Sequence, residues 1–73
     1  MSGFVIVYDR STRVSHVTSY VGDQGYREAF NERMRLEAEN TDPNVEIVSL
    51  VSDSLESARA THSRYFENVV AGV

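Results

Sequence analysis

The stretch Phe4-Val5-Ile6-Val7-Tyr8 decides the fold, because no other five consecutive residues of the chain are all apolar or aromatic. The run is too short for a helix and is rich in β-branched residues, so it indicates a strand that avoids water on both faces. Such a strand belongs inside a sheet rather than at its edge. We therefore expect a central strand over about residues 4–9, with the other elements arranged around it.

The elements on either side of this strand follow from local patterns. The polar interval 9–13 predicts a hairpin loop, and the weakly apolar segment 14–21 predicts an edge strand. A second strongly apolar strand is expected over about residues 45–51. Helix-forming residues predict helices over about 24–40 and 53–68, with Asp23 and Asp53 as N-caps and Glu56 completing a capping box after Asp53.

The element order predicts one α+β domain over residues 1–73 with the arrangement ββαβα. A helical crossover returns the third strand beside the first, which predicts a three-stranded, mainly antiparallel sheet in the order 2-1-3. We expect both helices to pack on one face, because a three-layer structure is hard to fill with 73 residues. The competing arrangement has one helix on each face, which would let a monomer bury both sides of the sheet.

Two helices on one face would leave apolar strand residues uncovered on the other face. A contiguous exposed apolar patch usually marks an interface, and a second copy of the chain is the simplest partner. We therefore predict a homodimer that meets through the sheet. The predicted interface residues come from the first and third strands and are Phe4, Val5, Ile6, Val7, Tyr8, Val48 and Leu50.

Composition narrows the classes of function. The chain has no cysteine and only two histidines, which excludes disulfides and thiolate zinc sites, and we predict neither a metal nor another cofactor. The net charge of −4 argues against a domain that mainly neutralises a phosphate backbone. No segment has the length of a membrane span, and residues 1–4 do not resemble a signal peptide, so we expect a cytoplasmic protein without membrane contact.

Two small groups of residues invite a functional interpretation. Arg10 and Arg13 flank the expected hairpin loop and are candidates to contact an anion or a protein partner, although a solvated turn is the simpler interpretation. His62 and Tyr65 on the second helix are candidates for a ligand pocket, although a histidine on an apolar helix face is more often packed in a core. The spacing of His16 and His62 resembles no metal motif.

The leading hypothesis is thus a non-enzymatic interaction module that presents a sheet face or an edge strand to a protein partner and forms a homodimer. One alternative is a nucleic-acid-binding module that uses Arg10, Arg13 and strand aromatics such as Phe4, Tyr8 and Tyr20. The other alternative is a minimal enzyme or small-ligand binder centred on His62. No catalytic residue can be named from the sequence.

Overall fold

The computed structural model describes residues 2–70, so residues 1 and 71–73 of the expected domain lie outside the described part. None of its helices is long and apolar enough to cross a membrane. The elements are β1 (Ser2–Asp9), β2 (Val14–Tyr20), α1 (Gly25–Glu39), β3 (Val45–Ser52), α2 (Leu55–Thr61), the 3₁₀-helix η1 (Ser63–Phe66) and β4 (Val69–Val70).

The sheet has the strand order β3-β1-β2-β4, with β1 antiparallel to both of its neighbours. This confirms the α+β class, the central position of the first strand and the order 2-1-3. The very short β4, which the sequence does not predict, adds a fourth strand parallel to β2. It pairs with only the first part of β2, at Ser15 and His16.

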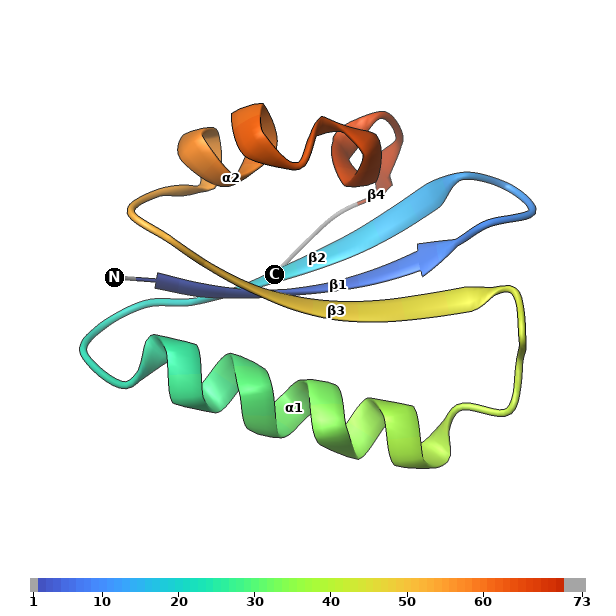
Figure 1. Cartoon of the computed structure of the whole chain (residues 1–73), viewed down its shortest axis with the longest axis horizontal. Coiled ribbons are helices and arrows are strands. Elements are labelled where there is room, and N and C mark those ends of the chain that lie inside the picture. The colour runs from blue at the N-terminus through green and yellow to red at the C-terminus, as the bar shows by residue number, and fades with distance from the viewer. Residues whose placement is uncertain (1, 71–73) are drawn as a thin grey trace.

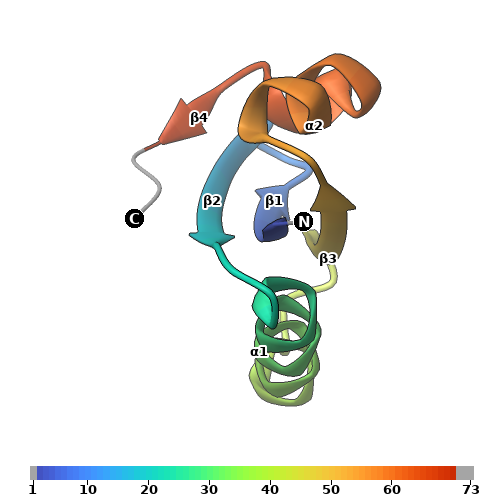
Figure 2. The ribbon, with the colours of Figure 1, turned by 90° about the vertical axis from the view of Figure 1, so that its left-hand side faces the viewer.

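The two helices lie on opposite faces of the sheet, so the prediction that they share one face is wrong (Figures 1 and 2). The crossover from β2 to β3 places α1 on one face, while α2 and η1 cover the other. The physical reason is the two-sided apolarity of β1, since one helical segment on each face removes both sets of its side chains from water.

Each face therefore has its own small core. On the α1 side, Val5 packs with Ala29 and Ile47. On the other side, Ile6 and its neighbours Tyr8 and Val17 pack against a half-buried group made up of Val48, Leu50, Tyr65 and Phe66. The alternation of side chains along β1 assigns its odd-numbered residues to the first core and its even-numbered residues to the second.

Both helices begin one residue later than the predicted caps imply. Gln24 precedes α1 and makes no side-chain capping bond. Ser54, not Asp53, caps α2, because its hydroxyl accepts a hydrogen bond from the Ser57 amide at 3.1 Å. The second helix is also shorter than expected, since α2 ends at Thr61 and the chain continues as η1.

Candidate functional site

The predicted interface residues lie mostly inside the chain. Phe4, Val5, Ile6 and Tyr8 are all buried. Val7, Val48 and Leu50 are half-buried. The interface prediction depended on one uncovered sheet face, and the helix on each face removes that premise. A second copy of the chain could not reach the buried residues of β1 while both helices stay in place.

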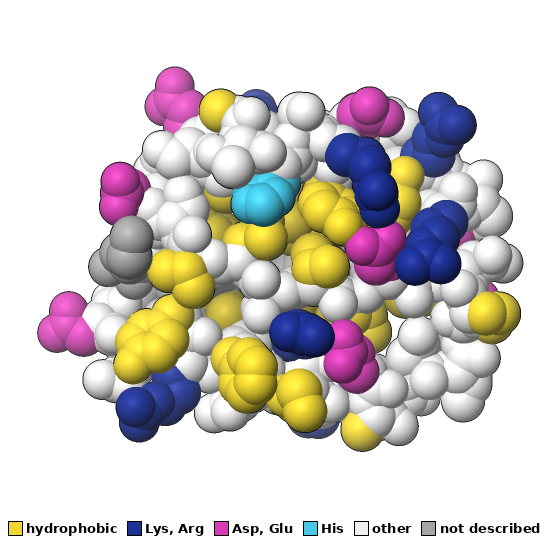
Figure 3. Space-filling model, in the orientation of Figure 1, with side chains coloured by type: hydrophobic (Ala, Val, Ile, Leu, Met, Phe, Trp, Pro, Cys, Tyr) yellow, Lys and Arg dark blue, Asp and Glu magenta, His cyan; other side chains and the backbone are white. Residues whose placement is uncertain are grey.

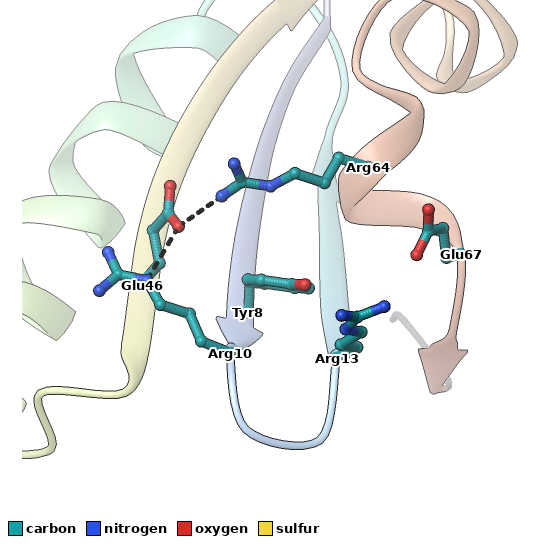
Figure 4. A pocket seen from close by; sticks show the side chains of 6 residues that line it. All are labelled: Tyr8, Arg10, Arg13, Glu46, Arg64 and Glu67. Atoms are coloured by element: carbon teal, nitrogen blue, oxygen red, sulfur yellow. Dashed lines mark hydrogen bonds and ion pairs between the residues drawn. The ribbon is translucent and has the colours of Figure 1, made fainter.

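A pocket of about 700 Å³ opens beside the hairpin loop, on the face of the sheet that carries α2 and η1 (Figure 4). It forms where η1 ends and the sheet continues beyond the helical cover. Its lining comes from four separate parts of the chain, namely Tyr8, Arg10, Arg13, Glu46, Arg64 and Glu67. Arg10 and Arg13, which were predicted to contact an anion or a partner, thus line one pocket together with a third arginine, Arg64.

Glu46 on β3 lies at one side of this pocket, and three donors converge on its carboxylate. Arg10 Nε donates to Oε1 at 3.4 Å, and Arg64 Nη2 donates to the same oxygen at 2.8 Å (Figure 4). The Tyr65 hydroxyl donates to Oε2 at 2.5 Å. The Glu46 side chain is only 21% exposed, which reduces the screening of these contacts by water.

Two tyrosine rings hold the guanidinium of Arg64 in place. Its Cζ lies 4.8 Å from the centroid of Tyr65 and 5.6 Å from that of Tyr8. The two rings contact each other edge to face at a centroid distance of 5.5 Å. This cation–π arrangement restricts a long side chain that would otherwise move freely at the surface.

The hydrogen bonds also shift the pKa values of two residues, Glu46 and Tyr65. The hydrogen bond from Tyr65 lowers the pKa of Glu46 below its ordinary value, and Arg10 and Arg64 add to this against the opposing effect of burial. The same hydrogen bond raises the pKa of Tyr65, because the carboxylate favours the protonated phenol. Glu46 therefore carries a negative charge and Tyr65 stays neutral near pH 7.

Arg13 differs from the other two arginines of the pocket. Within residues 2–70 its guanidinium makes no ion pair, even though Glu67 lines the same pocket. Its backbone φ is 62°, a left-handed conformation that glycine or asparagine adopts more readily. An arginine thus stands at a hairpin position whose backbone favours a smaller residue.

The histidines do not form a site with these residues. His62 is half-buried between α2 and η1, where its backbone N–H donates to Ala58 and its carbonyl accepts from Tyr65. His62 and Tyr65 do not act as the predicted pair, because the Tyr65 hydroxyl donates to Glu46 and not to His62. His16 lies on the α1 face of the sheet and His62 on the opposite side, so they cannot share a metal.

The aromatic platform proposed for nucleic acid is also absent from the described strands. Phe4 and Tyr8 are buried on the face beneath α2 and η1. Tyr20 lies on the opposite face and packs against the core under α1. Bases therefore have no shared surface on which to stack against these three rings.

The outer edge of β3 is a second candidate surface, because no described strand pairs with it (Figure 2). The Ser15 N–H donates to the Asn68 carbonyl and not to β1. Ser15 and its ladder partner Tyr8 are therefore a non-hydrogen-bonded pair, and the backbone N–H and C=O groups of Tyr8 point towards β3. Hydrogen-bonded and non-bonded pairs alternate in an antiparallel ladder. The backbone N–H and C=O groups of Ile47, Ser49 and Val51 therefore point outward.

An apolar stripe on α1 runs beside this open edge. Tyr26, Phe30 and Met34 follow one another at intervals of four residues and are 44%, 49% and 49% exposed. Glu28 and Glu32 lie near Tyr20 on the β2 side of the helix, which assigns the stripe to the β3 side. Figure 3 shows apolar side chains gathered over α1 on the face where β3 is nearest the viewer.

Sequence reasoning missed Glu46, Arg64 and the open edge of β3. Glu46 and Arg64 lie 18 residues apart in different elements, so no local spacing relates them. A single charge in an otherwise apolar strand was the one available signal for Glu46. Comparison of the chain with protein-family models, with curated proteins and with solved structures finds no match.

Proposed function

We propose that this protein is a small, non-enzymatic interaction module that forms a homodimer by pairing the β3 strands of two copies. The single observation that carries the proposal is the open β3 edge beside an exposed apolar stripe. The sheet-mediated dimer expected from the sequence is thus retained, but its contact moves from the sheet face to the sheet edge.

The sequence of β3 is complementary to itself in one antiparallel register. When Ser49 of one copy lies opposite Ser49 of the other, Ile47 faces Val51 and Val48 faces Leu50 across the two-fold axis. Every apolar residue between 47 and 51 then meets another apolar residue. The outward-pointing residues also fall opposite one another, so each such pair can exchange both of its backbone hydrogen bonds.

The β3 edge carries none of the devices that normally prevent such pairing. Exposed edges are usually protected by lysine, proline, inward-pointing charges or bulges. Residues 47–51 contain no charge and no proline, and they pair with β1 in an unbroken register. The one charged residue of the strand, Glu46, is held by arginines in the pocket.

The stripe on α1 extends the contact beyond the strand. A two-fold axis through Ser49 brings the same side of both α1 helices to the joined edge, where Phe30 can meet its counterpart. Arg33 and Glu37, which form an ion pair 3.1 Å apart on this side, add a polar rim. An apolar centre with a polar border is the usual composition of a protein interface.

Replacing Ser49 by proline is the sharpest test. The Ser49 amide points outward, so proline removes an edge donor without breaking the ladder to β1. We expect sedimentation velocity to show the wild-type mass rising from 8.2 kDa to twice that value with concentration, while the Ser49→Pro variant stays at 8.2 kDa.

A second variant covers the case in which proline disturbs the fold. Phe30→Lys places a charge in the stripe and should also give a monomer, whereas Val21→Lys, at an apolar position that is 76% exposed and outside the stripe, should leave the dimer intact. Circular dichroism checks that each variant is folded. A wild-type protein that stays monomeric at millimolar concentration, or a dimer that survives both variants, would contradict the proposal.

A further inference from the structure

The Glu46 pocket contains two hydrogen-bond donors that have no partner in the described part of the chain. One is the guanidinium of Arg13, and the other is the hydroxyl of Tyr8. Both residues line the pocket, and Figure 4 shows the Tyr8 ring between Glu46 and Arg13, with its hydroxyl end pointing towards Arg13 and away from Glu46. An acceptor group that entered the pocket would therefore meet free donors without displacing an internal hydrogen bond.

The charge of the pocket selects the kind of acceptor. Three arginines and two glutamates line it, which leaves one positive charge in excess. A carboxylate, with one negative charge, neutralises this excess. A phosphate group, which carries close to two charges at pH 7, would bring the second charge near Glu46 and Glu67. The balance therefore favours a carboxylate over a phosphate.

The backbone conformation of Arg13 indicates that its side chain has a binding role. The position requires a positive φ, which an arginine adopts only at an energetic cost that glycine avoids. Its guanidinium offers a planar pair of donors that matches a carboxylate in a bidentate contact. A solvated turn would gain nothing from arginine at this position, whereas a carboxylate-binding pocket would.

The remaining arginines are already ordered before any ligand binds. Glu46 holds Arg10 and Arg64, and the rings of Tyr8 and Tyr65 hold the guanidinium of Arg64. A pocket whose side chains are fixed in advance loses less conformational entropy on binding. Their outer surfaces stay accessible, since the side chains of Arg10 and Arg64 are 57% and 60% exposed.

From these observations we infer that the pocket binds a carboxylate of an acidic segment of a partner protein, with Arg13 and the Tyr8 hydroxyl as its direct contacts. The site is built by a single chain and lies apart from the outward-pointing groups of β3. The inference is therefore independent of the proposed dimer, and binding should persist in the Ser49→Pro variant.

The test is an NMR titration of the ¹⁵N-labelled protein with an acetylated, amidated peptide that contains a single glutamate. We expect amide shifts around Arg13, Glu46 and Arg64, with a Kd of about 1 mM or tighter. Arg13→Gln should weaken binding by at least about tenfold, because it removes a charged hydrogen-bond donor. Arg13→Gly should weaken binding equally while raising the melting temperature.

Matched controls separate this site from general charge attraction. Arg27→Gln makes the same charge change at an exposed position on α1 and should leave the affinity unchanged. The same peptide with glutamine in place of the glutamate should not bind, and the same peptide with phosphoserine at that position should bind more weakly than the glutamate peptide. The inference is overturned if no shifts occur, if Arg27→Gln weakens binding as much as Arg13→Gln, or if the phosphoserine peptide binds more tightly.

Discussion

At the scale of single residues, Glu46 shows how a polar group becomes part of a small apolar domain. It stands in a strand that is otherwise apolar or small, and its carboxylate accepts from Arg10, Arg64 and Tyr65. A partly buried carboxylate without such donors would lose its hydration without compensation. The network thus lets β3 carry a charge on a face that is covered by η1.

The Glu46–Tyr65 hydrogen bond makes stability depend on pH in a defined direction. Because the pKa of Glu46 is lowered in the folded state, its contribution is complete above the ordinary value of 4.5 and is lost as the pH falls through the folded value. We expect Tyr65→Phe to lower the free energy of unfolding by about 1 kcal/mol at pH 7. This difference should shrink towards zero below the folded pKa of Glu46.

Urea denaturation at a series of pH values measures this difference. Tyr26→Phe is the matched control, since Tyr26 is exposed on α1 and makes no side-chain hydrogen bond within the described residues. A difference between wild type and Tyr65→Phe that stayed constant from pH 7 to pH 3 would show that the Tyr65 hydroxyl stabilises the fold independently of the charge on Glu46.

At the scale of elements, the start of α1 lies against the start of β1. A Cβ atom built on Gly3 would clash with the carbonyl oxygen of Gly25 and would lie 2.8 Å from the Cβ of Ala29. A Cβ on Gly25 would clash with the carbonyl oxygen of Tyr20. The two glycines let the helix approach the sheet closely enough for Ala29 to be buried against it.

Gly3→Ala should therefore force α1 away from the sheet. Its neighbours are backbone and a buried alanine, which cannot move as a flexible side chain could. We expect a loss of about 1–3 kcal/mol in the free energy of unfolding, as is typical of overpacked sites. Urea denaturation measures the loss, and Ser2→Ala at the preceding, half-buried position should change stability little. Equal stability of both variants would mean that the helix can shift without cost.

At the scale of the whole molecule, a chain of 73 residues forms two thin cores instead of one larger core. Each core has the sheet on one side and helical segments on the other, α1 for one core and α2 with η1 for the other (Figure 1). Domains of this size bury a smaller fraction of their unfolded surface than larger domains do, and are only marginally stable alone. Pairing along β3 would add buried area where both helices leave the sheet edge open.

The stability of such a molecule should depend on its concentration. If only the folded chain dimerises, association shifts the folding equilibrium by mass action. We expect the melting temperature of the wild type to rise by several degrees over a hundredfold increase in concentration, because each kcal/mol corresponds to about 4–8 °C in a domain of this size. Calorimetry should show no such rise for Ser49→Pro. A concentration-independent wild type would argue against the dimer.

Much of the fold could be predicted from local patterns along the chain. Phe4 to Tyr8 is apolar without interruption, so it had to be a central strand, and the chain order then allowed few sheet topologies. The hairpin arginines were also visible as candidates, because Arg10 and Arg13 flank an evident turn. These predictions concern residues that are close in the sequence, and for such residues the side-chain pattern is sufficient to identify strands and turns.

Tertiary structure alone decided which helix covers which face and which side chains meet in the pocket. Periodicity shows that both faces of β1 are apolar, but it does not state whether a helix or a second chain covers each face. Likewise, Glu46 and Arg64 become neighbours only after β3 and η1 pack on the same face of the sheet. Contacts between distant residues depend on the path of the whole chain, whereas strands and turns depend mainly on short-range sterics and hydrophobic pattern.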